Sequence, residues 1–186
     1  AIPHSGAGRI EEYLPMKVVD GVEPYGKQYV EWLVSEVMPR VERAFRIRKG
    51  PEHTAIGGSS LGAAVSLYAA ASRPETFGIV LAESLPLLSG RPSAWTGFLD
   101  GINAWPSRIY LGMGGQETGR DPSKAERNRQ YVEAARALEA RLTAAGLGAG
   151  RRLLIVEEDA MHNEDAWARR LPAALKFLFP LSPEGK

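Results

Sequence analysis

The sequence contains no cysteine. Without cysteine the chain can form no disulfide framework, offers no thiol nucleophile and cannot build a thiolate metal site. This absence fits a reducing compartment, so we expect a cytoplasmic location. The run "HNED" places a single histidine, His162, beside acidic residues and lacks the spacing of a multi-ligand metal site. We therefore expect no bound metal.

Long apolar runs and an excess of one charge are also missing. No run approaches the ~20 apolar residues that a membrane-spanning helix needs. The 23 basic and 22 acidic residues leave a net charge of +1, and this balance argues against nucleic acid or an anionic membrane as a partner. The opening "AIPHSGAGR" has neither the basic nor the apolar region of a signal peptide, so we expect none at Ala1.

Four short apolar segments alternate with helical patterns along the chain. They lie at residues 54–58, 77–84, 107–114 and 151–158, and they predict strands. Buried strands separated by helices are typical of a parallel sheet that is covered on both faces. We therefore predict a single α/β domain over residues 1–186, built as a three-layer αβα sandwich around a mostly parallel sheet.

Helical periodicity fills most of the intervals between these segments. A helix over residues 27–45, bent at Pro39, should turn inward one face made of Tyr29, Leu33, Val37, Val41 and Phe45. Small residues predict a second helix over 60–72. The segment 85–107 predicts a loop.

Two longer helices are expected in the second half of the chain. Ser123 is a plausible N-cap and Gly146 a C-terminal stop for the first of them. The second follows His162, and its inward face should consist of Trp167, Leu171, Leu175 and Leu178.

The stretch "GGSSLG" lies where the first strand should turn into a helix. Reactive groups in an αβα sheet collect at the carboxyl ends of the strands. A serine there is lifted clear of the backbone by a strained turn, and the residues two before and two after it crowd each other, which requires G-x-S-x-G. Ser60 has the flanks Gly58 and Gly62, whereas Ser59 would have Leu61. Ser60 is therefore the candidate nucleophile; the alternative is a glycine-rich turn that binds phosphate or only turns.

A serine is a weak nucleophile until a base accepts its proton. The chain offers three histidines. His53 starts the strand that ends near Ser60, so at about 3.3 Å per residue it lies on the order of 20 Å away, at the wrong edge. His4 precedes Ser60, whereas the chain order of this architecture is serine, acid, histidine. His162 satisfies that order and is the candidate base; the alternative is a loop histidine at a helix start.

The acid that orients the histidine should come from a neighbouring strand end. Glu117 is the first carboxylate after the glycine-rich end of the third strand. Asp121 follows four residues later, and Glu83 ends the second strand. Glu117 is preferred, but all three remain candidates because the geometric role decides. Asp159 and Asp165 are expected to cap or surround the histidine loop.

Four stretches together resemble a known family: "RIEEYLP", "YVEWLVSEVMP", "AIGGSSLG" and "HNEDAWARRLPAALKFLF". They are similar to the putative-esterase family, which groups enterochelin esterase-like enzymes, S-formylglutathione hydrolase and the mycolyltransferases of the antigen 85 type. The resemblance runs from about Arg9 to Phe179. It implies an α/β-hydrolase fold with ester hydrolysis or acyl transfer and no cofactor.

The resemblance also implies roles for particular residues. The serine of the family corresponds to Ser60, its histidine to His162, and its acid, which can be a glutamate, to Glu117. The amide of Leu61 would be the first donor to the oxyanion. Ala63 replaces a glycine that is common in the family.

The family further implies more chain than residues 1–186 contain. Its counterpart of residues 8–15 follows several strands, so we expect the C-terminal two-thirds of the fold here. The second oxyanion donor would belong to the missing part. The chain is then a fragment, is completed by another polypeptide, or is a miniature hydrolase. We expect the strand at 54–58 to pair with more chain, from upstream or from a second subunit, because no lysine or proline discourages pairing.

We accordingly expect a serine hydrolase that cleaves a small-molecule carboxylic ester through a Ser-His-Glu triad and an acyl-enzyme, without a cofactor. The alternatives are acyl transfer to another alcohol and a non-catalytic half-domain that pairs with a partner chain. The segment 85–107 should roof the acyl pocket, with Trp95 and Phe98 either as its walls or as ordinary loop anchors.

Overall fold

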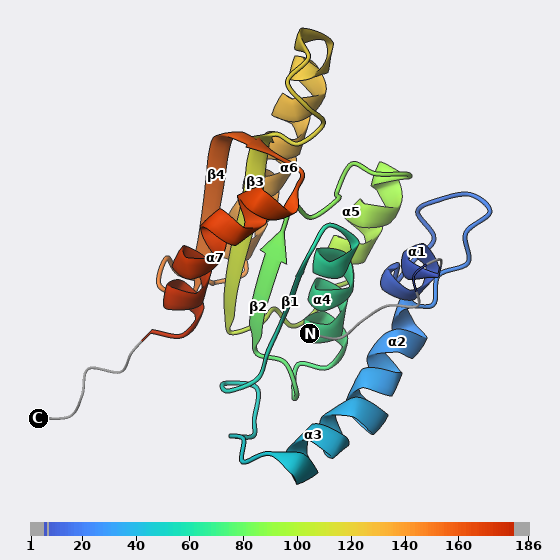
Figure 1. Ribbon diagram of the computed structural model, residues 1–186, viewed down its shortest axis with the longest axis vertical. Coiled ribbons are helices and arrows are strands. Elements are labelled where there is room, and N and C mark those ends of the chain that lie inside the picture. The colour runs from blue at the N-terminus through green and yellow to red at the C-terminus, as the bar shows by residue number, and fades with distance from the viewer. Residues whose placement is uncertain (1–5, 7, 181–186) are drawn as a thin grey trace, which may run out of the picture.

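The computed structural model describes residue 6 and residues 8–180, and its centre is a four-stranded sheet (Figure 1). The strands lie side by side in chain order: β1 (Ala55–Ser59), β2 (Ile79–Glu83), β3 (Arg108–Gln116) and β4 (Arg152–Met161). All three neighbouring pairs are parallel. The predicted parallel sheet is confirmed, and the carboxyl ends of its strands therefore meet at one edge.

Helical segments fill most of the intervals between the strands. Before the sheet lie α1 (Arg9–Tyr13), α2 (Gly26–Trp32), the π-helical turn η1 (Leu33–Val37) and α3 (Met38–Ala44). Between and after the strands lie α4 (Leu61–Ser72), α5 (Pro92–Asp100), the 3-10 turn η2 (Pro122–Lys124), α6 (Ala125–Ala144) and α7 (Glu164–Leu178).

These helices cover the two faces of the sheet, as the predicted αβα sandwich requires (Figure 1). On one face, residues of α4 and α6 pack with the strands in a large apolar cluster that includes Ile109 and Leu142. Side chains alternate along a strand, so Ile79 and Tyr110 point to the other face, where they pack against Ala174 of α7. The sheet is thus the middle layer of three.

The helix predicted over residues 27–45 is present but interrupted. Its bend is a π-helical turn that ends immediately before Met38 and Pro39. Proline has no N–H to continue an α-helical ladder, and a π turn is a common way to absorb such an interruption. The predicted inward face is wrong at its end, because Val41 and Phe45 are exposed, whereas Leu33 is buried.

The segment 85–107 contains a helix, so the prediction of a loop there is wrong. α5 begins with Pro92 in its first turn, where the fixed φ of proline favours a helix start. Trp95 holds the helix against the protein, since its ring is buried and its indole N–H donates to the Ser89 carbonyl at 2.9 Å. Proline and serine near this segment's start mark the beginning of a helix.

The N-terminal end of α6 differs from the prediction, whereas its C-terminal end agrees with it. Ser123 is not the N-cap of α6: it lies in η2, where the Asp121 carboxylate accepts its backbone N–H at 2.9 Å. Gly146 follows the helix with a φ of +87°, a left-handed conformation that glycine adopts without strain and that ends helices. The predicted stop is confirmed.

The buried face of α7 is rotated from the predicted one. Leu178 is buried as expected, but Leu171 and Leu175 are 42% and 44% exposed, so their predicted inward position is wrong. Arg170 is buried instead, because it pairs with Glu83 of β2. An ion pair beneath the helix therefore sets which side of α7 faces the sheet.

β1 forms one edge of the sheet. The Ser60 N–H donates to the Glu83 carbonyl of β2 at 2.8 Å, so by alternation along the strand the backbone groups of Gly57 and Ser59 point away from β2. No strand of the described part of the chain pairs with that side. A groove of about 500 Å³ runs beside it, lined by β1, by α4 and by Tyr29 and Leu33.

Among the helices formed by residues 8–180, none combines the length and the apolar character of a membrane-spanning helix.

Candidate active site

Ser60 occupies a strained turn between β1 and α4. Its φ and ψ of 56° and −124° place it in a region that residues with a Cβ rarely adopt. The backbone on both sides holds this conformation, since the Ser60 N–H donates to the Glu83 carbonyl and its own carbonyl accepts from Ala63 N–H at 3.0 Å. The local geometry is that of a nucleophile elbow.

The two flanking glycines are required for different reasons. A Cβ on Gly58 would lie 2.7 Å from the carbonyl carbon of Gly62, which the backbone cannot accommodate. A Cβ on Gly62 would meet no atom within 4 Å. The sequence predicts that a side chain at either position would clash. The structure has such a clash at Gly58, whereas Gly62 has space for a methyl group.

Leu61 is the first residue of α4. Its backbone amide therefore lies at the N-terminus of a 12-residue helix. Amides at such an end have no partner within the helix, and the helix dipole favours negative charge beside them. The amide predicted as an oxyanion donor is therefore in an electrostatically suitable place.

His162 lies at the carboxyl edge of the sheet, directly after β4 and just before α7. Its Nδ1 is 2.6 Å from Oε2 of Glu117, which follows β3. The Glu117 side chain is 2% exposed, whereas that of His162 is 36% exposed. The structure thus brings together the predicted base and the preferred acid, with the acid buried beneath an accessible ring.

The other two candidate acids have different partners. Asp121 is exposed and accepts hydrogen bonds from the backbone and the hydroxyl of Ser123. Glu83 is buried and receives the guanidinium of Arg170, whose closest nitrogen lies at 2.7 Å. Each is occupied by a group other than His162.

The Glu117 carboxylate is held at both oxygens. Oε1 accepts the Ser84 hydroxyl at 2.7 Å and the Gly114 N–H at 2.6 Å, while Oε2 faces His162. Burial by itself raises the pKa of this carboxyl group, but hydrogen bonds from His162, Ser84 and Gly114 and the charge of His162 together hold the pKa below its ordinary value. Glu117 is therefore an ionised acceptor at neutral pH.

A hydrogen bond joins the start of α7, which follows the His162 loop, to the end of β2. Trp167, in the first turn of α7, donates its indole N–H to Ser84 Oγ at 2.9 Å. Ser84 follows β2, which is the neighbour of the strand leading to Ser60. Among the hydrogen bonds of the described residues none joins Ser60 to His162, and this contact is often long in unliganded enzymes.

Three residues of this site were not found from the sequence. Ser84 and Trp167 had no motif of their own, although Ser84 ends the predicted strand 77–84 and Trp167 belongs to the helix predicted after His162. Asn128 of α6 is buried and binds the loop that carries Glu117: it accepts from Thr118 N–H and donates to the Gly119 carbonyl, both at 2.8 Å. Such contacts between distant segments leave no local pattern.

The predicted pocket walls lie apart from this cluster. The ring of Trp95 is only 2% exposed and belongs to the apolar core. Phe98 packs against Tyr68, with 6.3 Å between ring centroids, about two helical turns along α4 from Ser60. His53 precedes β1, at the edge opposite Ser60 as predicted, and His4 lies outside the described residues.

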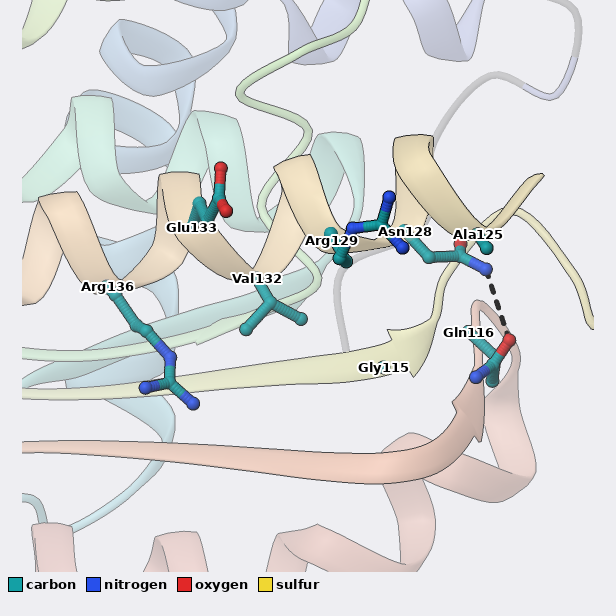
Figure 2. Close-up of a pocket in the computed structure, with 8 residues that line it drawn as sticks. All are labelled: Gly115, Gln116, Ala125, Asn128, Arg129, Val132, Glu133 and Arg136. Atoms are coloured by element: carbon teal, nitrogen blue, oxygen red, sulfur yellow. Dashed lines mark hydrogen bonds between the residues drawn. The ribbon is translucent and has the colours of Figure 1, made fainter. Parts of the chain in front are cut away.

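A cavity of about 480 Å³ lies between the end of β3 and α6 (Figure 2). Figure 2 shows Asn128 Nδ2 donating to Gln116 Oε1, at 3.1 Å, on its rim. Neither Ser60, Glu117 nor His162 lines this cavity. It therefore adjoins the acid loop from the α6 side and is separate from the cluster described above.

No group of three or more histidine and carboxylate side chains within the described ranges is arranged to hold a metal ion.

Comparison with known proteins identifies relatives of similar architecture. A family model described as "Putative esterase" matches residues 10–178. Uncharacterized protein YbbA of Bacillus subtilis (strain 168) is 20% identical over 181 residues, covering 92% of this chain and 69% of that protein. The enterochelin esterase of Shigella flexneri has a TM-score of 0.68 at 19% identity, over 97% of this chain and 41% of that one. For the BES protein of Bacillus cereus the TM-score is 0.68 at 17% identity, over 96% and 66%.

These matches differ in what they establish. The chain spans 41% of the enterochelin esterase chain and 66% of the BES chain, so both relatives are considerably longer. Their structural likeness at such identities shows the shared α/β-hydrolase-like fold. The family model matches nearly the whole described part of the sequence, and the matched residues include Ser60, Glu117 and His162. The chain therefore belongs to the putative esterase family.

Proposed function

We propose that this chain carries the catalytic residues of a serine esterase, which cleaves a small-molecule carboxylic ester through an acyl-enzyme. The observation that carries the proposal is the 2.6 Å contact between His162 Nδ1 and the buried Glu117 carboxylate, at the sheet edge where Ser60 sits in its strained turn. A serine hydroxyl is activated when a histidine accepts its proton and an ionised carboxylate holds the histidine ring in place.

In the acylation step, Ser60 Oγ attacks the ester carbonyl carbon while the second ring nitrogen of His162 accepts the hydroxyl proton. The carbonyl oxygen becomes an oxyanion, which the Leu61 amide at the α4 N-terminus would stabilise. Glu117 holds the ring and stabilises its positive charge. The tetrahedral intermediate collapses when the bond to the leaving oxygen breaks, and His162 returns the proton to the departing alcohol.

In the deacylation step, a water molecule takes the place of the alcohol. His162 accepts a proton from this water as its oxygen attacks the acyl carbon. The bond between that carbon and Ser60 Oγ then breaks, the proton returns to Ser60, and the carboxylic acid leaves. An alcohol in place of water would make the same site an acyltransferase.

The class of substrate is supported by the family and by the fold relatives. The Shigella flexneri relative is named an enterochelin esterase, so its name describes ester cleavage. The cluster of Ser60, His162 and Glu117 needs no cofactor for such a reaction, since proton transfer and covalent catalysis come from side chains alone.

We further propose that β1 is covered in the working protein by another strand, either from an upstream segment or from a second chain. Within residues 8–180 no strand pairs with the outward backbone groups of Gly57 and Ser59, which lie beside a groove with apolar and aromatic walls. An added strand would also be a source for the second oxyanion donor, and a chain that acts only by such pairing is the second candidate function.

The esterase proposal is tested by a burst experiment with p-nitrophenyl acetate. The protein should release p-nitrophenol in a burst that matches its concentration, because the first turnover acylates the serine. Ser60→Ala should abolish the burst, and Ser59→Ala, which removes the adjacent hydroxyl, should keep it. An unchanged burst in Ser60→Ala would contradict the proposal, and the absence of both a burst and steady-state hydrolysis in the wild type would favour the non-catalytic alternative.

The proposal for β1 is tested by light scattering and hydrogen exchange. We expect residues 1–186 to associate, with slow exchange at the Gly57 and Ser59 amides once the edge is paired. A monodisperse monomer in which both amides exchange rapidly would contradict pairing in this chain.

A further inference from the structure

Two side chains at the site have no part in the mechanism above. Ser84 is buried and follows β2, and Trp167 is half-buried in the first turn of α7. They are linked to each other and to the acid: Trp167 Nε1 lies 2.9 Å from Ser84 Oγ, which lies 2.7 Å from Glu117 Oε1. Three elements are thereby joined by two hydrogen bonds.

The direction of both hydrogen bonds follows from the chemistry of the groups. An indole N–H can only donate, so Ser84 Oγ is its acceptor. A serine hydroxyl has a single proton, and an ionised carboxylate can only accept. The Ser84 proton is therefore directed to Glu117, and Trp167 helps to fix it there by occupying a lone pair of the hydroxyl oxygen.

The backbone of Ser84 has a strained conformation. Its φ of +49° is in the left-handed region, and the described residues include one other non-glycine with positive φ, Ser60. The Ser84 N–H donates to the Gly112 carbonyl of β3 at 2.8 Å, which holds the strained conformation. Strain of this kind costs about 1–3 kcal/mol and persists where surrounding structure holds it. Both strained serines directly follow adjacent strands and point to the same edge.

Trp167 also contacts the base. Its ring and that of His162 have centroids 5.2 Å apart and an interplanar angle of 83°, an edge-to-face arrangement. Trp167 therefore touches the imidazole directly and the carboxylate through Ser84. One side chain restrains both members of the His162–Glu117 pair.

Resting on the proposed esterase function, we infer that Ser84 and Trp167 are positioning residues that together fix the Glu117 carboxylate and the His162 ring in the orientation needed to serve Ser60. Ser84 turns Oε1 away from the ring and leaves Oε2 to face it, and Trp167 fixes the Ser84 hydroxyl and packs on His162. Neither side chain exchanges a proton with the substrate.

The inference is tested with a double-mutant cycle on p-nitrophenyl acetate hydrolysis. Ser84→Ala should lower kcat about 10-fold to 100-fold with KM changed less than about 2-fold, because a hydrogen bond to a charged group is lost and substrate contacts are not. Trp167→Phe keeps an aromatic ring but removes the N–H, and should lower kcat by a smaller factor. The double variant should resemble Ser84→Ala, since the indole N–H acts on Glu117 only through Ser84.

The pH profile separates this role from a loss of stability. Removing the Ser84 donor takes away one hydrogen bond to the ionised carboxylate, so the pKa of Glu117 should rise, and the pH profile of its carboxyl signal, followed by carbon-13 NMR, should move to higher pH. Ser107→Ala is the matched control: its hydroxyl donates to the Gly78 carbonyl at 2.8 Å, at the opposite end of the sheet. Its kcat and pH profile should stay like wild type.

The outcomes distinguish this inference from the proposed function. Activity that survives Ser60→Ala overturns the esterase mechanism itself. If Ser60→Ala is inactive but Ser84→Ala and Trp167→Phe match Ser107→Ala in kcat and pH profile, the mechanism stands and the positioning role is refuted. Additive losses in the double variant also refute the coupling of the two residues. Should Ser84→Ala not fold, the pH profile of the Glu117 carboxyl signal and the kcat of Trp167→Phe still decide.

Discussion

Arg170 and Glu83 form a buried, multidentate ion pair between α7 and β2. Arg170 Nε and Nη2 lie 3.0 and 2.7 Å from Glu83 Oε2, and both side chains are 4% exposed. Glu83 immediately precedes Ser84, so the pair supports the same strand end that carries the hydroxyl bound to Glu117. The pair therefore ties the packing of α7 to the geometry of the site.

Breaking this pair should destabilise the protein strongly. Arg170→Leu leaves the Glu83 charge buried without its main partner, and such losses cost about 3–5 kcal/mol of unfolding free energy. The adjacent Arg169 pairs with Glu157 among the described residues and is more than half exposed, so Arg169→Ala should change the free energy of unfolding by about 1 kcal/mol or less. Urea unfolding followed by tryptophan fluorescence measures both, and equal effects would contradict the structural role of the pair.

Glu117→Gln should keep the fold and lose several orders of magnitude in kcat. The amide is nearly isosteric with the acid but cannot stabilise the imidazolium, and it can favour the wrong tautomer of His162. Steady-state kinetics, with circular dichroism to verify folding, provides the measurement. Asp121→Asn is the control and should have near-normal kcat; a crippled Asp121→Asn beside an active Glu117→Gln would reassign the acid.

The two described histidines should differ sharply. His162→Ala removes the proposed base, and kcat should collapse because no other group can accept the Ser60 proton. His53→Ala should stay near wild type, since His53 lies before β1 at the opposite edge. Parallel measurement of kcat is the test, and similar losses in both variants would refute the assignment.

Stability should depend on acidity through Glu117. Its pKa in the folded protein is lowered, so its contribution to the unfolding free energy is complete above the ordinary carboxyl value, about 4.3, and is lost as the pH falls through the folded-state value. Below about pH 4.3 the wild type should therefore lose stability more steeply than Glu117→Gln. Urea unfolding at several pH values gives the two slopes, and equal slopes would contradict the lowered pKa.

The elbow glycines should respond differently to alanine. Gly58→Ala forces a methyl group against the backbone of Gly62, so the elbow must shift, with loss of both stability and activity. Gly62→Ala has open space and should keep the fold and most of kcat. Thermal unfolding and kcat of the two variants test the difference, and a tolerated Gly58→Ala would show that the elbow is less confined than described.

Much of the sheet could be predicted from the sequence. Buried parallel strands are continuous apolar runs, so the segments around Ile79, Ile109 and Leu154 are visible without a structure. The elbow and the position of His162 follow from chain order and from the shared edge of parallel strands. These features can be predicted because they depend on the local residue pattern and on the order of strands and helices along the chain.

The remaining features depend on contacts between distant segments. The inward face of α7 is set by Arg170, whose charge excludes it from an apolar pattern until Glu83 is placed beneath it. The choice of Glu117 over Asp121 depends on where a glycine-rich loop turns after β3. Ser84 was hidden for the same reason, because its partners lie 33 and 83 positions further along the chain.

Under the proposed mechanism, the open side of β1 would make Ser60 sensitive to a segment that binds beside it. Ser60 is anchored through its N–H to β2 on one side, while on the other side no strand of the described residues pairs with the backbone of Ser59. A strand bound along this edge would restrict the residues that lead into the elbow, and would pay part of the ordering cost of the strained turn. By linkage, a substrate or inhibitor that needs an ordered Ser60 would in turn tighten the binding of that strand. Binding of a strand to the edge of β1 and the rate of ester hydrolysis would then both report how fully the Ser60 turn is ordered.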